Sequence, residues 1–128
     1  MPLRHNHKSA PTILIIGQDQ MLNGLLVEAL KIEYDGAMLY ITNEQGALEM
    51  ATHIEPDLLI IDDERLDLHV LELSDRLHSI KEQESVPTII IDSHAAAWSK
   101  RRRYHLIFLR KPFDVQQFYA AVQKALTA

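Results

Sequence analysis

The sequence has no cysteine, and only four glycines, five prolines and one tryptophan among its 128 residues. Without cysteine there is no disulfide, no thiolate nucleophile and no cysteine-ligated zinc site. Long hydrophobic runs are also missing, because no apolar stretch reaches the roughly 20 residues that a membrane-spanning helix needs. The first residues lack the apolar segment of a signal peptide. We therefore expect a soluble, cytoplasmic protein in which residues 1–11 form a flexible tail and residues 12–128 one domain.

The charge balance is mildly acidic, with 13 lysine and arginine residues against 18 acidic ones and a formal net charge of −5. A domain that binds nucleic acid over much of its surface is usually basic, so this composition argues against direct nucleic-acid binding. Hydrophobic residues make up 47% of the chain, which favours an ordered globular domain. The seven histidines lack the spacing of a metal site. Gly17 stands alone after the first apolar run, without a glycine-rich nucleotide loop.

Five short apolar runs along the chain predict five strands. Several of them are almost continuously aliphatic, which is typical of strands buried on both faces of a parallel sheet. The runs cover residues 12–16, 37–41, 58–61, 88–91 and 106–109.

Helical patterns with one apolar stripe each separate these runs. The stripes comprise Leu22, Leu25, Leu26, Ala29 and Leu30 in the first helix, Ala47, Leu48 and Ala51 in the second, Val70, Leu73, Leu77 and Ile80 in the third, and Val115, Phe118, Val122, Ala125 and Leu126 in the last. Capping boxes are predicted at Thr42 with Gln45 and at Asp114 with Gln117. A further short helix is predicted over residues 94–104.

Strict alternation of strands and helices indicates a doubly wound α/β domain with right-handed crossovers. In such a sheet the functional site lies beyond the carboxyl ends of the strands. The residues that follow the runs are therefore the candidates, and acidic and basic side chains collect among them: Gly17, Gln18, Asp19, Asn43, Asp62, Asp63, Glu64, Asp92, Ser93, Arg110, Lys111 and Pro112.

Three stretches resemble the receiver domain of two-component response regulators, and the likeness extends over residues 12–126. Residues 56–62 (PDLLIID) are similar to the family's third strand, which ends in its phosphoacceptor aspartate. Residues 71–77 keep the register of its third helix, and residues 108–114 (FLRKPFD) are similar to the end of its fifth strand with the following lysine and proline. The resemblance implies a flavodoxin-like fold, a five-stranded parallel sheet of order 2-1-3-4-5 with flanking helices.

The resemblance assigns Asp62 the place of the phosphoacceptor and Lys111 the place of the lysine that pairs with the phosphate. The family also has two acids after the first strand that hold magnesium, and a hydroxyl after the fourth strand. Gly17 and Gln18 stand at the acid positions here, and Asp92 stands at the hydroxyl position. A carboxylate there repels a phosphoryl group, and loss of the cation slows phosphoryl transfer, which depends on positioning and electrostatic stabilisation.

Simpler structural roles remain open for these residues. Asp62 could form a structural ion pair with Lys111, and Asp92 could be the permanent partner of that lysine. Asp19 could cap the first helix. A rearranged magnesium site built from Asp19, Asp62 and Glu64 is the weaker alternative, and the sequence implies no other cofactor.

A compact basic run, residues 100–103 (KRRR), falls on the predicted fourth helix. In the family the fourth helix, fifth strand and fifth helix form the usual dimer or output surface. The resemblance therefore implies an interaction surface, including a possible homodimer contact, that contains Trp98, Arg101, Arg102 and Phe108. A solvated helix face is the simpler interpretation of the basic run.

These observations predict a signal-transduction receiver-like domain that acts through protein–protein interaction and is no enzyme beyond autocatalytic phosphoryl acceptance. Phosphorylation at Asp62 is expected to be impaired or absent, because Gly17 and Gln18 replace the acid pair. The alternative is a phosphorylatable receiver that accepts a phosphoryl group on Asp62 from a histidine kinase. The expected partners are a histidine kinase or an effector domain. A small α/β enzyme or nucleotide binder is a third hypothesis, which fold analogy alone supports.

Overall fold

The computed structural model describes residues 10–62, 67–80, 86–92 and 106–127. Its sheet has five strands: β1 (Thr12–Gly17), β2 (Met38–Thr42), β3 (Leu58–Asp62), β4 (Thr88–Asp92) and β5 (Leu106–Arg110). The strand order is β2-β1-β3-β4-β5, and every neighbouring pair is parallel. The predicted doubly wound sheet and its strand order are confirmed, and each strand lies within one residue of its predicted bounds.

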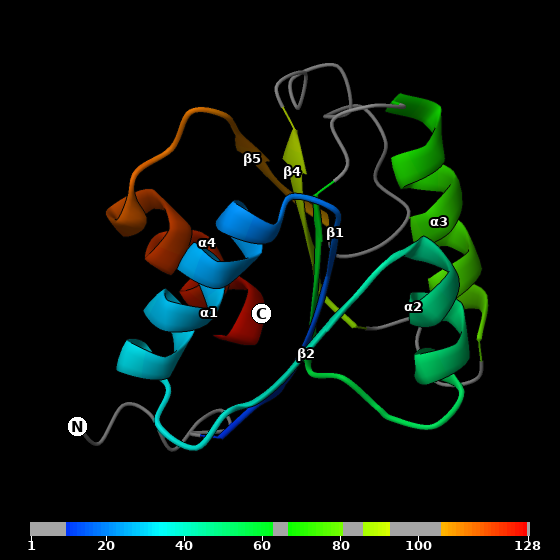
Figure 1. Cartoon of the computed structure of the whole chain (residues 1–128), viewed down its shortest axis with the longest axis horizontal. Coiled ribbons are helices and arrows are strands. Elements are labelled where there is room, and N and C mark those ends of the chain that lie inside the picture. The colour runs from blue at the N-terminus through cyan, green and yellow to red at the C-terminus, as the bar shows by residue number, and fades with distance from the viewer. Residues whose placement is uncertain (1–9, 63–66, 81–85, 93–105, 128) are drawn as a thin grey trace.

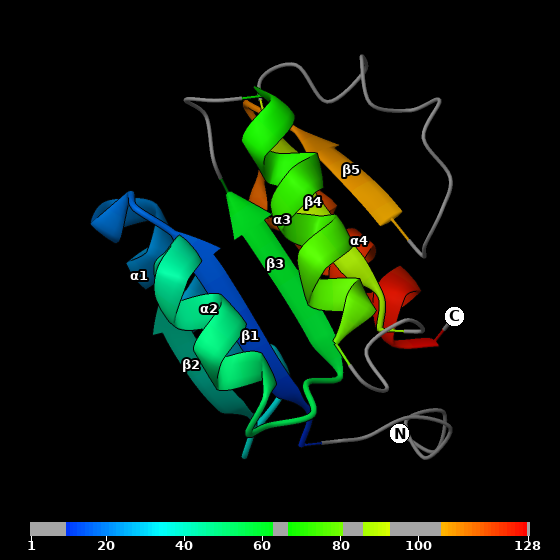
Figure 2. The same cartoon turned by 90° about the vertical axis from the view of Figure 1, so that its right-hand side faces the viewer.

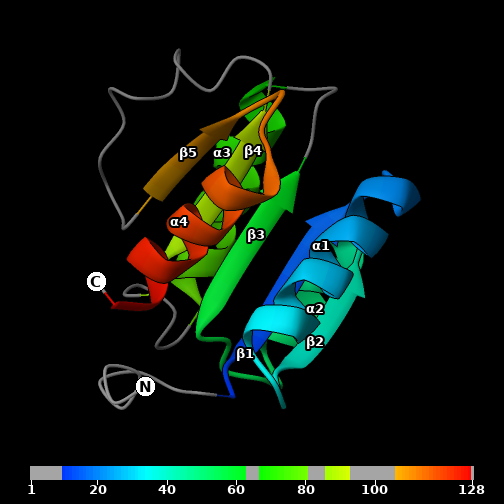
Figure 3. The same cartoon turned by 90° about the vertical axis from the view of Figure 1, so that its left-hand side faces the viewer.

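Helices cover both faces of this sheet. Within the described ranges they are α1 (Gln20–Glu33), α2 (Glu44–Ala51), α3 (Asp67–Ser79) and α4 (Val115–Thr127). Helices α1 and α4 lie on one face and α2 and α3 on the other (Figure 1). Figure 2 looks onto the layer of α2 and α3, and Figure 3 looks onto the layer of α1 and α4. The predicted helix at residues 94–104 lies outside the described residues, so α4 corresponds to the last predicted helix.

The central strands are buried because a helix layer covers each face of the sheet. Successive side chains of a strand point to opposite faces, so each strand contributes to two cores. Ile13 and Ile60 pack with α1 and α4, whereas Leu14 and Ile61 pack with α2 and α3. All four side chains are fully buried. The continuously aliphatic runs therefore reflect burial on both faces. None of the described helices is long and apolar enough to cross a membrane.

The predicted apolar stripes are wrong at two positions, because Leu25 is 62% exposed and Val115 is 48% exposed. The buried residues of α1 are Asn23, Leu26 and Leu30. Leu25 precedes Leu26 and is therefore rotated from it by about 100° around the helix axis, away from the sheet. Leu25 and Val115 instead line an open, mainly apolar cavity of about 690 Å³ between α1 and the start of α4.

The two predicted capping boxes have different outcomes. The box at the start of α4 is confirmed: Gln117 N donates to Asp114 Oδ1 and Asp114 N donates to Gln117 Oε1, both at 2.8 Å. The box at Thr42 is wrong, because Thr42 still belongs to β2 and Asn43 caps α2 by accepting the N–H of Gly46 at 2.8 Å. The parallel ladder between β1 and β2 keeps Thr42 extended, so the helix begins after Asn43.

His78 is a fully buried polar side chain near the end of α3. Its Nδ1 lies 2.7 Å from Ser74 O and 3.2 Å from Ser74 Oγ. Its Nε2 lies 3.0 Å from Val86 O and 3.1 Å from Thr88 Oγ1. A neutral imidazole donates from one nitrogen and accepts at the other. Each ring nitrogen of His78 lies near a carbonyl oxygen that can accept a hydrogen bond and a hydroxyl that can donate one. The ring therefore links α3 to the start of β4.

Candidate functional site

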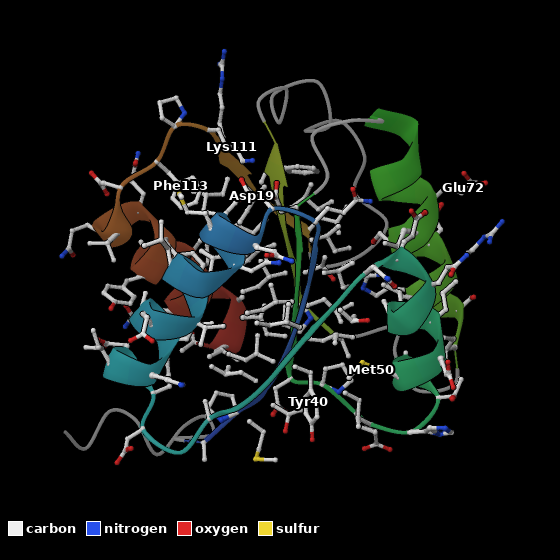
Figure 4. The ribbon with its side chains drawn as sticks, in the orientation of Figure 1. Asp19, Tyr40, Met50, Glu72, Lys111 and Phe113 are labelled. Atoms are coloured by element: carbon white, nitrogen blue, oxygen red, sulfur yellow. The ribbon has the colours of Figure 1, made fainter. Side chains whose placement is uncertain are left out.

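The carboxyl ends of the parallel strands meet at one edge of the sheet, and Figure 4 shows Asp19 and Lys111 at this edge. Gly17 ends β1 and Asp62 ends β3, and these two residues are partners in the strand register. The Asp62 side chain is only 2% exposed, since β3 lies between β1 and β4 in the middle of the sheet. The predicted acceptor position is therefore a buried carboxylate at the end of the central strand.

Lys111 brings a positive charge to this carboxylate. It follows the last residue of β5, and its Nζ lies 3.0 Å from Asp62 Oδ1. The Lys111 side chain is 17% exposed, so both charges are largely removed from water. Such a pair costs hydration of both groups, and loss of one partner leaves a poorly solvated charge. The structure thus brings together the two residues that the resemblance assigned to the acceptor and to its lysine.

A small cavity beside Asp62 is lined mainly by neutral groups. Its volume is about 10 Å³, which is room for about one water molecule. Glu44, in the first turn of α2, is a lining residue that the sequence reasoning did not single out, although it stands only two positions after the end of β2. The lining residues are Ile16, Gly17, Gln18, Asn43, Glu44, Ile61, Asp62 and Leu73.

Asn23 is a second residue of this region that the sequence reasoning missed. It lies on α1, is 5% exposed, and donates from Nδ2 to Gly17 O at 3.1 Å. With Leu26 and Leu30 it occupies spacing i, i+3 and i+7 on the buried side of the helix. A polar residue within that apolar stripe is the signal that could have revealed it. Asn23 ties the first turns of α1 to the end of β1.

Asp19 is the N-cap of α1. Its Oδ1 accepts the backbone N–H of Leu22 at 3.1 Å, and its backbone is extended, as N-caps usually are. This geometry corresponds to the simpler of the two roles that the sequence left open for Asp19.

Replacing Asp19 with alanine should lower the free energy of unfolding by about 1 kcal/mol, because the Leu22 N–H loses its acceptor. Asp19→Asn keeps an oxygen acceptor and should lose less. Chemical denaturation followed by circular dichroism measures both variants. Equal losses in the two variants would contradict the capping role.

The structure describes less of the remaining predicted site residues. Asp92 ends β4 opposite Arg110 in the strand register, and its side chain lies outside the described part of the chain. Phe108 is partly buried and packs against the core beneath α2 and α3. Outside the described residues lie Glu64, Trp98, Arg101 and Arg102.

The donors that the structure describes at this edge do not suit a magnesium ion. Mg²⁺ requires near-octahedral oxygen coordination, and proteins usually bind it through carboxylates. Gly17 has no side chain and Gln18 has a neutral amide, while one Asp62 oxygen faces the Lys111 ammonium group at 3.0 Å. Among the residues that the structure describes, no group of three histidine or acidic side chains could hold a metal ion.

No protein-family model matches the sequence, and no curated protein matches it. Solved structures do match, over nearly the whole chain. The receiver domain of a sensor histidine kinase from Pseudomonas aeruginosa PAO1, solved with magnesium coordinated in its active-site cleft, has a TM-score of 0.75 at 15% identity and covers 93% of this chain and 99% of that one. A response regulator receiver protein from Sinorhizobium medicae WSM419 has a TM-score of 0.71 at 22% identity, with 93% and 96% coverage. A pilus assembly protein, CpaE from Caulobacter crescentus CB15, has a TM-score of 0.71 at 14% identity, with 92% and 95% coverage.

The chain has the response regulator receiver fold. This outcome confirms the predicted resemblance at the level of the fold, which is what structural likeness at these identities establishes. In this receiver fold a buried aspartate ends β3 and a lysine follows β5, whereas a glycine ends β1.

Proposed function

We propose that this chain is a receiver-like signal-transduction domain that acts through protein–protein contacts, with phosphorylation at Asp62 impaired or absent. The observation that carries the proposal is that Gly17 and Gln18, beside the buried Asp62–Lys111 pair, supply no negative charge for a cation.

The charges around Asp62 support this proposal. A phosphoryl group carries close to two negative charges at neutral pH, and it would arrive next to a carboxylate that is already negative. Phosphoryl transfer depends on positive groups that neutralise the transferring oxygens. Lys111 contributes one positive charge, and its Nζ already lies beside Asp62 Oδ1. The sensor-kinase receiver domain of similar fold was solved with magnesium in its cleft, whereas the donors described here do not suit that ion.

The second candidate function is a receiver that accepts a phosphoryl group on Asp62 from a histidine kinase. The retained positions of Asp62 and Lys111 favour it, because both charged groups stand where the resemblance requires them. On either hypothesis the chain is a signalling module and not a turnover enzyme. The proposed partners are a histidine kinase or an effector domain, and a homodimer contact across β5 and the last helix belongs to the same proposal.

Incubation with a small phosphodonor and Mg²⁺ should leave the intact mass of the protein unchanged. The physical reason is the missing acid pair at Gly17 and Gln18, and intact-mass spectrometry is the measurement. A receiver domain with both acids, treated in parallel, shows that the donor is active. A stable gain of one phosphoryl group that disappears in Asp62→Asn would refute the proposal and support the phosphorylatable alternative.

A further inference from the structure

Asn23 combines burial with an unsatisfied polar atom, and it lies beside the Asp62 site. Its Nδ2 donates to Gly17 O, but its buried Oδ1 has no hydrogen-bond partner in the described part of the chain. A flipped amide would place Oδ1 against the Gly17 carbonyl oxygen and lose that hydrogen bond, so the carbonyl determines which amide atom faces it. The amide oxygen is therefore held beside the Cα of Gly17.

The space next to Gly17 is tight for a side chain. A Cβ atom at this position would lie 3.1 Å from Asn23 Oδ1, 3.2 Å from Asp62 O and 3.4 Å from Asp62 Cβ. Contacts this short are tighter than most contacts that a Cβ atom makes, so the neighbouring atoms would have to give by a few tenths of an ångström. An acidic side chain at position 17 would meet this crowding and would also lie near the amide oxygen of Asn23. Its carboxylate is negatively charged and the amide oxygen carries a partial negative charge, so the two groups would repel each other.

We propose that Asn23 closes the Asp62 site to divalent cations, as a positioning residue that excludes a carboxylate at position 17. The inference rests on the proposed function and extends it. The acid pair is missing, and Asn23 of α1 also crowds position 17, where the first acid of the pair would stand. Lys111 faces Asp62 from β5, and Asn23 borders Gly17 from α1. Restoring the acids alone therefore does not restore a metal site.

The test compares metal binding in three variants of the full chain, with Mn²⁺ as the probe ion and electron paramagnetic resonance as the readout. The first variant carries Gly17→Asp and Gln18→Asp. The second adds Asn23→Ala, and the third, a matched control, adds the exposed Gln20→Ala instead. We expect the Asn23→Ala variant to bind Mn²⁺ at least about tenfold more tightly than the other two, a ratio that corresponds to about 1.4 kcal/mol. Equal affinities in all three variants, whether tight or undetectable, overturn the inference.

A second measurement covers the case in which an aspartate at position 17 prevents folding. Gly17→Ala adds only the crowded Cβ, so it should lower the thermal midpoint by less in the Asn23→Ala background than in the otherwise unchanged chain. Additive shifts would overturn the inference as well.

The closing experiment separates this inference from the proposed function. The phosphodonor assay on the unaltered chain decides whether Asp62 is phosphorylated, and the Mn²⁺ series decides whether Asn23 obstructs position 17. Phosphorylation of the unaltered chain would defeat the proposed function and leave the comparison among the three variants intact. A flat Mn²⁺ series would defeat the inference and leave the phosphodonor result unchanged.

Discussion

Lys111→Met should lower the free energy of unfolding by about 3–5 kcal/mol, the cost expected when one partner of a buried ion pair is removed. The substitution keeps a long side chain but removes the ammonium group that lies 3.0 Å from Asp62 Oδ1. Asp62 is 2% exposed, so water compensates poorly for the lost positive charge. Urea denaturation followed by circular dichroism measures the loss.

Two further variants make this prediction specific to the ion pair. Asp62→Asn combined with Lys111→Met removes both charges and should recover much of the lost stability, because a neutral amide is less costly to bury than a carboxylate. Lys124→Met changes an exposed lysine in the last turn of α4 and should shift stability by no more than about 0.5 kcal/mol. A loss below about 1 kcal/mol for Lys111→Met, the range of an exposed pair, would contradict a buried ion pair.

His78→Leu should lower the free energy of unfolding by about 2–4 kcal/mol. Leucine fills a similar space but offers no polar atom, so Val86 O and Thr88 Oγ1 lose the ring nitrogen that lies within 3.1 Å of each. A buried polar group that loses its partner costs about 1–3 kcal/mol, and within the described residues only the longer contact of 3.4 Å between Thr88 Oγ1 and Val86 O remains. The effect should appear in urea denaturation followed by circular dichroism.

His53 offers the control for this prediction. It is exposed, and its Nδ1 makes a solvent-exposed contact with Thr52 Oγ1 at 3.3 Å. His53→Leu should therefore change the free energy of unfolding by no more than about 0.5 kcal/mol. If His78→Leu were as stable as the unchanged chain, the buried network would not hold α3 to β4.

The site has a mechanical consequence as well as a chemical one. The Asp62–Lys111 pair connects the end of the central strand to the segment after β5, and Asn23 connects α1 to the end of β1. These two contacts tie the ends of β3 and β1 to neighbouring elements.

Much of the architecture could be predicted from the sequence, because strands buried on both faces need continuous aliphatic runs. The runs placed all five strands to within one residue. The positions of Asp62 at the end of β3 and of Lys111 after β5 followed from these runs and from the resemblance. Local patterns failed where a neighbouring element decided the outcome. The ladder with β1 kept Thr42 in its strand, and the direction of α1 across the sheet left Leu25 exposed.

The sequence by itself therefore determined the parallel sheet, its helix layers and the strand-end positions of Asp62 and Lys111, since these depend on hydrophobic periodicity along the chain. Only the tertiary structure decided that Lys111 Nζ reaches Asp62 Oδ1 and that Asn23 occupies the space beside Gly17. Those contacts depend on strand register and on the rotation of α1 about its axis. Both result from packing between segments that are distant in the chain, and a local sequence pattern does not predict such packing.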